Sequence, residues 1–169
     1  MANTYVAIAT TTVGAGGASS IDFTSIPQTY TDLAIQISVR GTLNAGSQVI
    51  YLQFNNDTTS ANYQYIRLLG SGSAASSASG SDYIVDVTQG DNATASTFGS
   101  EFIYIPNYAG SNYKSVSNDF VGENNATLAY MGFMAFLWKS TSAISSIKLS
   151  SNGSFKQYTT ATLYGIKNS

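Results

Sequence analysis

The chain has 169 residues, with 7 Lys and Arg, 9 Asp and Glu and no His, which gives a formal net charge of −2. Charged residues make up 9% of the chain, against about 25% in typical soluble proteins, which excludes a basic nucleic-acid-binding surface and a polybasic membrane patch. Cys and His are both absent, which excludes disulfides, Cys/His zinc sites, thiol nucleophiles and imidazole catalysis.

The side-chain types favour strands over helices. Val, Ile, Thr, Tyr, Phe and Trp total 60 residues, whereas the straight-chain helix formers Leu, Met, Glu, Gln, Lys and Arg total 28. The first group fits a pleated, half-buried surface and the second favours helix. The polar surface is supplied by hydroxyls and amides rather than by charges, which suits a protein that ends up in an assembly.

Alternation of apolar and polar residues with period two recurs along the chain and predicts strands. The predicted strands are 4–13, 21–26, 32–40, 48–54, 63–69, 82–88, 100–105, 113–121, 126–139, 143–149 and 155–167. The alternation is cleanest in 32–40, where four side chains should be buried on one face, namely Leu33, Ile35, Ile37 and Val39. Gly- and Asn-rich turns separate the strands at 14–17, 44–46, 55–57, 90–92 and 152–153. Short strands of this kind without helical stretches predict an all-β fold, an antiparallel β-sandwich of jelly-roll type with about ten strands and almost no helix.

Residues 71–81 consist of Ser, Gly and Ala alone and have the composition of a linker. The strands before this segment are too few to close a separate sandwich. We therefore expect one domain over 1–169, with 71–81 as a surface loop. The start of the chain lacks the basic and apolar segments of a signal peptide, and no run of 18 apolar residues occurs, so we expect neither secretion nor a transmembrane helix.

The segment 130–138 is apolar on both faces of its predicted strand and contains no charge. One interpretation is a core strand of a monomer. The other is a strand whose outer side is covered by a loop or a second subunit, since Tyr and Trp rings are frequent at interfaces. In that case Tyr130, Phe133, Phe136 and Trp138 are the candidate interface residues.

Catalytic and metal-binding patterns are weak in this sequence. A glycosidase needs two suitably spaced carboxyl groups, and Glu101 and Glu123 are the two glutamates; they are read as surface or hydrogen-bonded carboxylates. The acidic residues Asp82, Asp86 and Asp91 match no calcium-loop spacing, and 55–57 is more simply a turn than a cation site. We expect no catalytic residue, no metal ligand, no cofactor and no enzymatic activity, while the many Tyr and Asn side chains leave sugar binding open.

Five segments are more specific. They are 7–12 (AIATTT), 25–33 (SIPQTYTDL), 103–111 (IYIPNYAGS), 123–127 (ENNAT) and 160–167 (TATLYGIK). Together they resemble a family of small structural proteins of tailed bacteriophages, especially phages of aquatic bacteria, over nearly the whole chain. The family brings no catalytic motif, so no site residue carries over.

The resemblance implies a virion structural protein made in the host bacterial cytoplasm. We expect a capsid decoration (cement) protein that binds the outer surface of the shell and stabilises it, with the major capsid protein or other virion proteins as partners. By analogy with such proteins a homotrimer is expected, and neither nucleic acid nor membrane is an expected partner. The alternative is a tail-fibre or receptor-binding module that recognises a host surface glycan through Tyr- and Asn-rich loops.

Overall fold

The chain is almost entirely β-structure. A computed structural model describes residues 4–123 and 129–167, and these contain twelve strands and one short 3₁₀ helix, η1 (Ser60–Asn62). The strands are β1 (Thr4–Thr12), β2 (Ala18–Phe23), β3 (Asp32–Val39), β4 (Ser47–Phe54), β5 (Tyr63–Gly70), β6 (Ala75–Gly80), β7 (Ile84–Gln89), β8 (Gly99–Ile105), β9 (Lys114–Glu123), β10 (Ala129–Trp138), β11 (Ile147–Phe155) and β12 (Thr160–Lys167). The predicted all-β class is confirmed, and in the described ranges no helix could cross a membrane.

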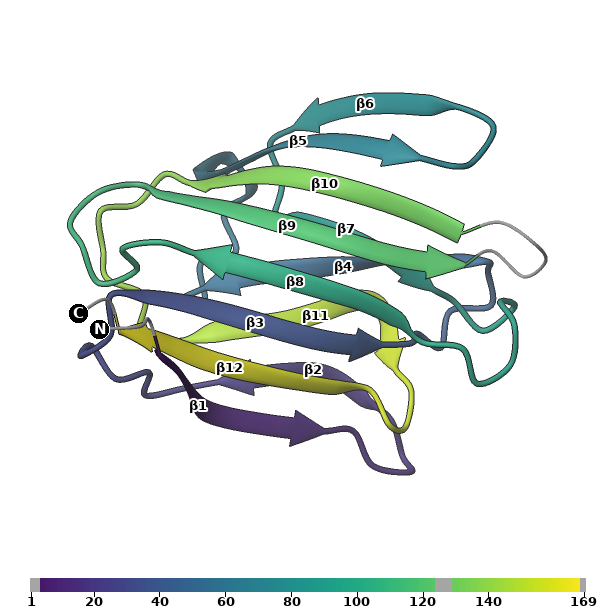
Figure 1. Ribbon diagram of the computed structural model, residues 1–169, viewed down its shortest axis with the longest axis horizontal. Helices are drawn as coiled ribbons and strands as arrows, with labels where there is room; N and C mark the ends of the chain where they lie inside the picture. Colours follow the sequence, from purple (N-terminus) through teal and green to yellow (C-terminus); the bar gives the residue numbers. More distant parts are fainter. Residues whose placement is uncertain (1–3, 124–128, 168–169) are drawn as a thin grey trace.

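The strands form two antiparallel sheets that pack face to face. The larger sheet has the order β1-β12-β3-β8-β9-β10-β5-β6, and the smaller has the order β2-β11-β4-β7. In Figure 1 the four-stranded sheet lies behind the eight-stranded one, and it covers only part of it. The outward side of the larger sheet therefore has no second layer over it among the described residues.

The pairing order is that of a jelly roll. Eight strands pair in a nested series, β1 with β12, β2 with β11, β3 with β8 and β4 with β7. The doubled chain is rolled up, because β12 also pairs with β3 and β11 with β4. This nested, rolled ribbon is the arrangement predicted from the sequence.

Four further strands extend the larger sheet beyond the jelly roll. The strands β5 and β6 form one hairpin, and β9 and β10 another, and the two hairpins pair with each other through β10 and β5. In Figure 1 they form the upper part of the sheet, with β6 at its free edge. This extension is the part of the larger sheet that projects farthest past the smaller one.

The core lies between the sheets and is built by the alternating residues of their strands. The four residues expected to share a buried face, Leu33, Ile35, Ile37 and Val39, are all buried. At the other end of the core Phe54 packs against Phe136 and Trp138, with ring centroids 6.2 and 5.4 Å apart. Edge-to-face and tilted aromatic pairs of this kind add about 0.5–1.5 kcal/mol each beyond area burial.

Strand boundaries differ from the prediction at several places: β2 begins three residues before the predicted 21–26, and β11 begins four residues after the start of the predicted 143–149. Residues 75–80, expected within a loop over 71–81, form β6, because Ser, Ala and Gly place no obstacle to backbone pairing with β5. The predicted strand 155–167 is broken by a turn in which Tyr158 adopts a left-handed φ of 73°, and the predicted turn at 152–153 lies inside β11. Residues 126–128 of the predicted strand 126–139 lie outside the described residues.

The turn predicted at 55–57 is confirmed. Asn55 and Asn56 have φ values of 52° and 56°, in the left-handed region that Asn tolerates. The side chain of Asn55 also joins the turn to the segment before β11, since its Nδ2 donates to the Ala143 carbonyl at 2.8 Å and its Oδ1 accepts from the Ser145 amide at 2.8 Å.

Candidate functional site

Strand β10 is apolar on both faces because the two faces have different surroundings. Phe136 and Trp138, which are 1% and 2% exposed, point toward the smaller sheet and belong to the core. Met131 and Phe133 lie on the outward face and are 66% and 53% exposed. Successive side chains of a strand point to opposite faces, so this division follows from the parity of the residue numbers.

The four interface candidates from the sequence therefore do not share a face. Phe133 is on the outward face, Tyr130 is half-buried on the opposite face, and Phe136 and Trp138 are in the core. A side chain on the inner face does not reach a partner that docks on the outward face, so Phe133 is the one of the four that remains in the set. The sequence had marked the correct strand without distinguishing its two sides.

Neighbouring strands add exposed apolar side chains beside Phe133. Residues directly opposite each other in an antiparallel pair share a face, and Phe133 is opposite Leu68 of β5, Met131 opposite Val121 of β9, and Ala135 opposite Ile66 of β5. We call the five large exposed members the Phe133 patch: Ile66, Leu68, Val121, Met131 and Phe133. The sequence did contain a signal for β5, because this strand has large apolar residues on both faces. Ile66 and Leu68 lie on the outward face, and Tyr63, Tyr65 and Leu69 lie on the other.

The patch is bordered by polar groups without positive charge. Asp119 of β9 is opposite Phe133, and Ser117 is opposite Ala135. Toward β6 the neighbours are hydroxyl groups, with Ser77 opposite Leu68 and Ser79 opposite Ile66. An apolar centre with a polar rim is the usual anatomy of a protein interface.

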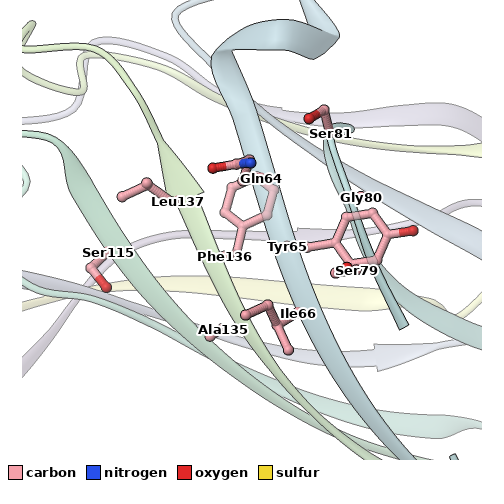
Figure 2. A pocket seen from close by; sticks show the side chains of 10 residues that line it. All are labelled: Gln64, Tyr65, Ile66, Ser79, Gly80, Ser81, Ser115, Ala135, Phe136 and Leu137. Atoms are coloured by element: carbon pink, nitrogen blue, oxygen red, sulfur yellow. The ribbon is translucent and has the colours of Figure 1, made fainter. Parts of the chain in front are cut away.

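Two grooves flank the patch where the sheet meets the β5–β6 hairpin. One has a volume of about 490 Å³ and is shown in Figure 2; its lining is Gln64, Tyr65, Ile66, Ser79, Gly80, Ser81, Ser115, Ala135, Phe136 and Leu137. The other, of about 530 Å³, is lined by residues 68–70, 75–77 and 131–133. Gly80 lets the ring of Tyr65 lie close to β6, since a Cβ at residue 80 would be only 3.0 Å from the ring. The small residues of β6 thus form one wall of both grooves.

Glu101, expected to be a surface or hydrogen-bonded carboxylate, is instead enclosed in the core, so that prediction is wrong for this residue. It is 1% exposed on the inner face of β8, and neither carboxylate oxygen has a hydrogen-bond partner. Burial raises the pKa of Glu101 to about 8, and the negative charge of Asp119 adds to the rise. The buried Oδ1 of Asn118 is also without a partner, while its Nδ2 donates to the Val85 carbonyl at 2.6 Å. A carboxyl group so placed does not contact a substrate at the surface.

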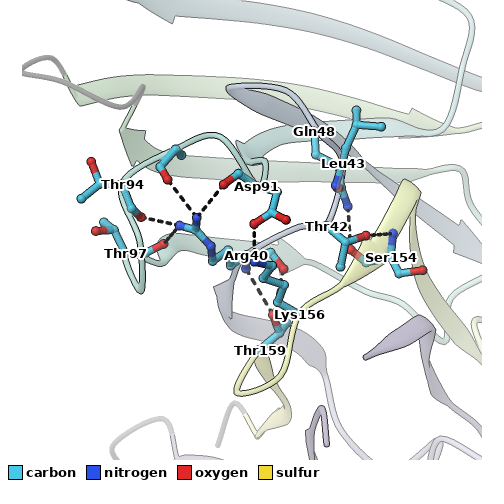
Figure 3. A network of polar contacts seen from close by, with 11 residues as sticks. Arg40, Thr42, Leu43, Gln48, Asp91, Thr94, Thr97, Ser154, Lys156 and Thr159 are labelled. Carbon is cyan, nitrogen blue, oxygen red and sulfur yellow. Dashed lines mark hydrogen bonds and ion pairs between the residues drawn. The ribbon is translucent and has the colours of Figure 1, made fainter. Parts of the chain in front are cut away.

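Glu123 has a different role, which is to fasten the connection between β7 and β8. Its carboxylate accepts hydrogen bonds from the Thr94 amide at 2.7 Å and the Thr94 hydroxyl at 2.9 Å. The same loop is also held by the side chain of the buried Arg40, as Figure 3 shows. Arg40 donates to four loop carbonyls at 2.6–3.3 Å, those of Asp91, Ala93, Thr94 and Thr97. These charged groups are used to fix a loop.

Asp57, the acidic member of the turn at 55–57, is likewise engaged inside the chain. It accepts from Trp138 Nε1 at 2.9 Å, from Asn62 Nδ2 at 2.8 Å and from the Thr59 amide at 3.0 Å. Burial raises the pKa of Asp57, but these hydrogen bonds outweigh burial and hold the pKa below its ordinary value. Over 4–123 and 129–167, no three acidic, His or Cys side chains gather to hold a metal ion.

Comparisons with known proteins add little to this geometry. No protein-family model matches the chain, and no curated protein matches it. Among solved structures, the crystal structure of galectin LEC-6 from Caenorhabditis elegans is similar over 94% of this chain and 96% of its own, with 8% identity and a TM-score of 0.32. A likeness at that level says nothing about function.

Proposed function

We propose that this chain is a non-catalytic structural protein of a bacteriophage virion, a decoration protein that docks on the outer surface of the capsid through the Phe133 patch. The patch is the observation that carries the proposal, because five large apolar side chains lie exposed together on one uncovered sheet face. The resemblance of five sequence segments to small virion proteins is the reason for proposing that the partner is a bacteriophage particle. The major capsid protein is the proposed partner.

The chemistry of this face suits docking between broad β-surfaces. The patch is surrounded by hydroxyls, including Ser77, Ser79 and Ser117, and few charges need to lose their water when a partner covers it. Binding should accordingly depend only weakly on salt, since salt screens charges and leaves apolar contacts in place.

The size of the patch limits what one copy can achieve. Its five side chains are already partly covered by the sheet, so each contributes roughly 1 kcal/mol when a partner covers the rest, or about 5 kcal/mol together. Association itself costs about 4–15 kcal/mol. A single patch therefore binds weakly, and stable attachment requires further contacts or several linked copies.

The proposal is tested by adding the purified chain to capsids that lack it and measuring cosedimentation. The wild-type chain should bind in hundreds of copies per particle and at high salt, and Phe133→Ser should lose most of this binding. Tyr158→Ser is the matched control, because Tyr158 is a 66% exposed aromatic residue on the turn before β12, outside the patch. Equal binding by the two variants would refute the proposal. A handful of copies confined to the tail would favour the receptor-binding alternative.

A further inference from the structure

The two sheets end in four edge strands, β1, β6, β2 and β7. An edge strand exposes unpaired backbone N–H and C=O groups that can pair with another chain, and proteins block such edges with bulges, charges, prolines or very short strands. Three of the four edges here carry one of these features.

Strand β1 contains a bulge, since Ala7 is opposite Tyr164 and Ala9 is opposite Leu163, which leaves one extra residue on the edge strand. Strand β7 has the same irregularity. Its residue 86 is opposite Ile50 and its residue 84 is opposite Tyr51, which leaves one extra residue on β7 between them. Strand β2 carries the exposed charge of Asp22. Each of these features disfavours the addition of another strand.

Strand β6 has none of them. Its sequence, ASSASG, contains no charge and no proline. It pairs with β5 in an unbroken register from Gly80 opposite Tyr65 to Ala75 opposite Gly70, without a bulge. Its side chains are all small, so a second strand could approach its backbone closely along the whole length.

We propose that two copies of this chain associate by pairing β6 with β6 in antiparallel orientation about a twofold axis, which joins the two larger sheets into one. A second copy is the partner that matches every requirement of the edge: it brings the same small side chains and an equally unprotected strand. The pairing uses the β6 edge of each copy. No β6 edge is then left for a third copy, so the assembly closes at the dimer. The inference rests on the sheet edges and does not require the proposed docking on a capsid.

The register follows from symmetry and from the outward face. A twofold axis perpendicular to the sheet keeps both outward faces on the same side, and centring it on Ser77 pairs residues 75–79 with 79–75 of the second copy. Ser77 is opposite Leu68, which is opposite Phe133. The row Phe133, Leu68, Ser77 is then continued by the same row of the second copy in reverse. With strands about 4.8 Å apart, the two Phe133 side chains lie roughly 24 Å apart on one surface.

The arrangement is tested first by disulfide cross-linking. The chain has no native cysteine, so any disulfide must form between the introduced thiols. In Ser77→Cys the two thiols face each other, and directly opposite Cα atoms are about 4.5–5.5 Å apart, within disulfide range. Ser79→Cys is the matched control on the same strand, because residue 79 faces residue 75 and the two thiols are more than about 10 Å apart. Mild oxidation should give a covalent dimer with Ser77→Cys only. Cross-linking of Ser79→Cys at the same rate, or of neither variant, would overturn the proposal.

Sedimentation of the purified chain, without any particle, gives the second test. The wild type should shift from monomer to dimer as concentration rises toward about 1 mM, because an interface of one strand pair is small. Ser77→Lys places two positive charges opposite each other and should weaken the dimer at least about tenfold. Thr10→Lys on the bulged edge β1 should leave it unchanged. A wild type that stays monomeric, forms a trimer, or dimerises equally well as Ser77→Lys would refute edge pairing, while the capsid-binding experiment would be unaffected.

Discussion

The buried carboxyl of Glu101 should make the protein less stable as pH rises, and Glu101→Gln should remove this dependence. The unfolded chain releases the Glu101 proton near its ordinary pKa of 4.5, whereas burial in the folded chain raises the pKa to about 8. The contribution of the protonated carboxyl is therefore fully present below pH 4.5 and is lost progressively up to about pH 8. Each pH unit in this window costs about 1.4 kcal/mol, which gives a loss of about 3 kcal/mol at pH 7.

The assay is urea unfolding at pH 5, 7 and 9, followed by the fluorescence of Trp138, the one tryptophan of the chain. Glutamine is neutral at every pH and nearly the same shape, so the two proteins should have similar stability at pH 5. At pH 9 Glu101→Gln should be more stable than the wild type by about 2–5 kcal/mol. Glu123→Gln is the control, because it changes the other glutamate, which binds Thr94 at the loop. It should keep the wild-type decline with pH. A wild type whose stability is flat or rising from pH 5 to 9 would show that Glu101 is not buried without a partner.

Three further substitutions test other contacts. Asp57→Ala leaves the buried Trp138 N–H without its acceptor and should lower the free energy of unfolding in urea at pH 7 by about 2–3 kcal/mol. The pKa of Asp57 is lowered in the folded chain, so the wild type should lose this advantage as pH falls through that pKa. Arg40→Met removes the donor to four loop carbonyls, so limited proteolysis should cut within 90–98 faster than in the wild type. Gly132→Ala places a Cβ 2.1 Å from the ring of Phe120 and should cost about 1–3 kcal/mol in thermal unfolding.

Each of these three has a control within the chain. Asp22→Ala removes an exposed carboxylate and should change stability by less than about 0.5 kcal/mol. Arg67→Met replaces the other arginine and should leave cleavage at 90–98 unchanged, and Gly14→Ala adds a Cβ where nothing lies within 4 Å. If a control and its test variant behave alike, the contact named for that variant does not matter.

The fold class was predictable because the hydrophobic pattern of the strands is strong. In β3 the alternation of Leu33, Ile35 and Ile37 with small or polar residues sets both strand type and buried face. The hairpin strand β6 was not predictable, since Ser and Ala residues carry no pattern and pair only because β5 is beside them. The turn between β11 and β12 was hidden for a different reason: Tyr158, which adopts positive φ there, is a residue type that favours strands.

The candidate site was predictable in part. The run of apolar residues in 130–138 marked a strand with two apolar faces, and Phe133 is on the uncovered one. Which face the core takes depends on where the smaller sheet lies, and three of its four strands, β2, β4 and β7, are distant from β10 in sequence. Ile66 and Leu68 belong to the patch because they lie opposite Ala135 and Phe133 and so share the outward face, while Tyr63 of the same strand faces the core.

The nested pairing of the jelly roll determines when the protein can fold during its synthesis. Strand β1 pairs with β12, from Thr4 opposite Lys167 to Thr12 opposite Thr160, and β2 pairs with β11. At about 5–20 residues per second, the ribosome takes roughly 7–30 s to make the chain between β1 and β12. During that time the first strands have no native neighbour, and contacts so distant in sequence also form slowly. The nascent chain must therefore keep its N-terminal strands from pairing wrongly until the last strand emerges, and few charges are present to repel other chains meanwhile.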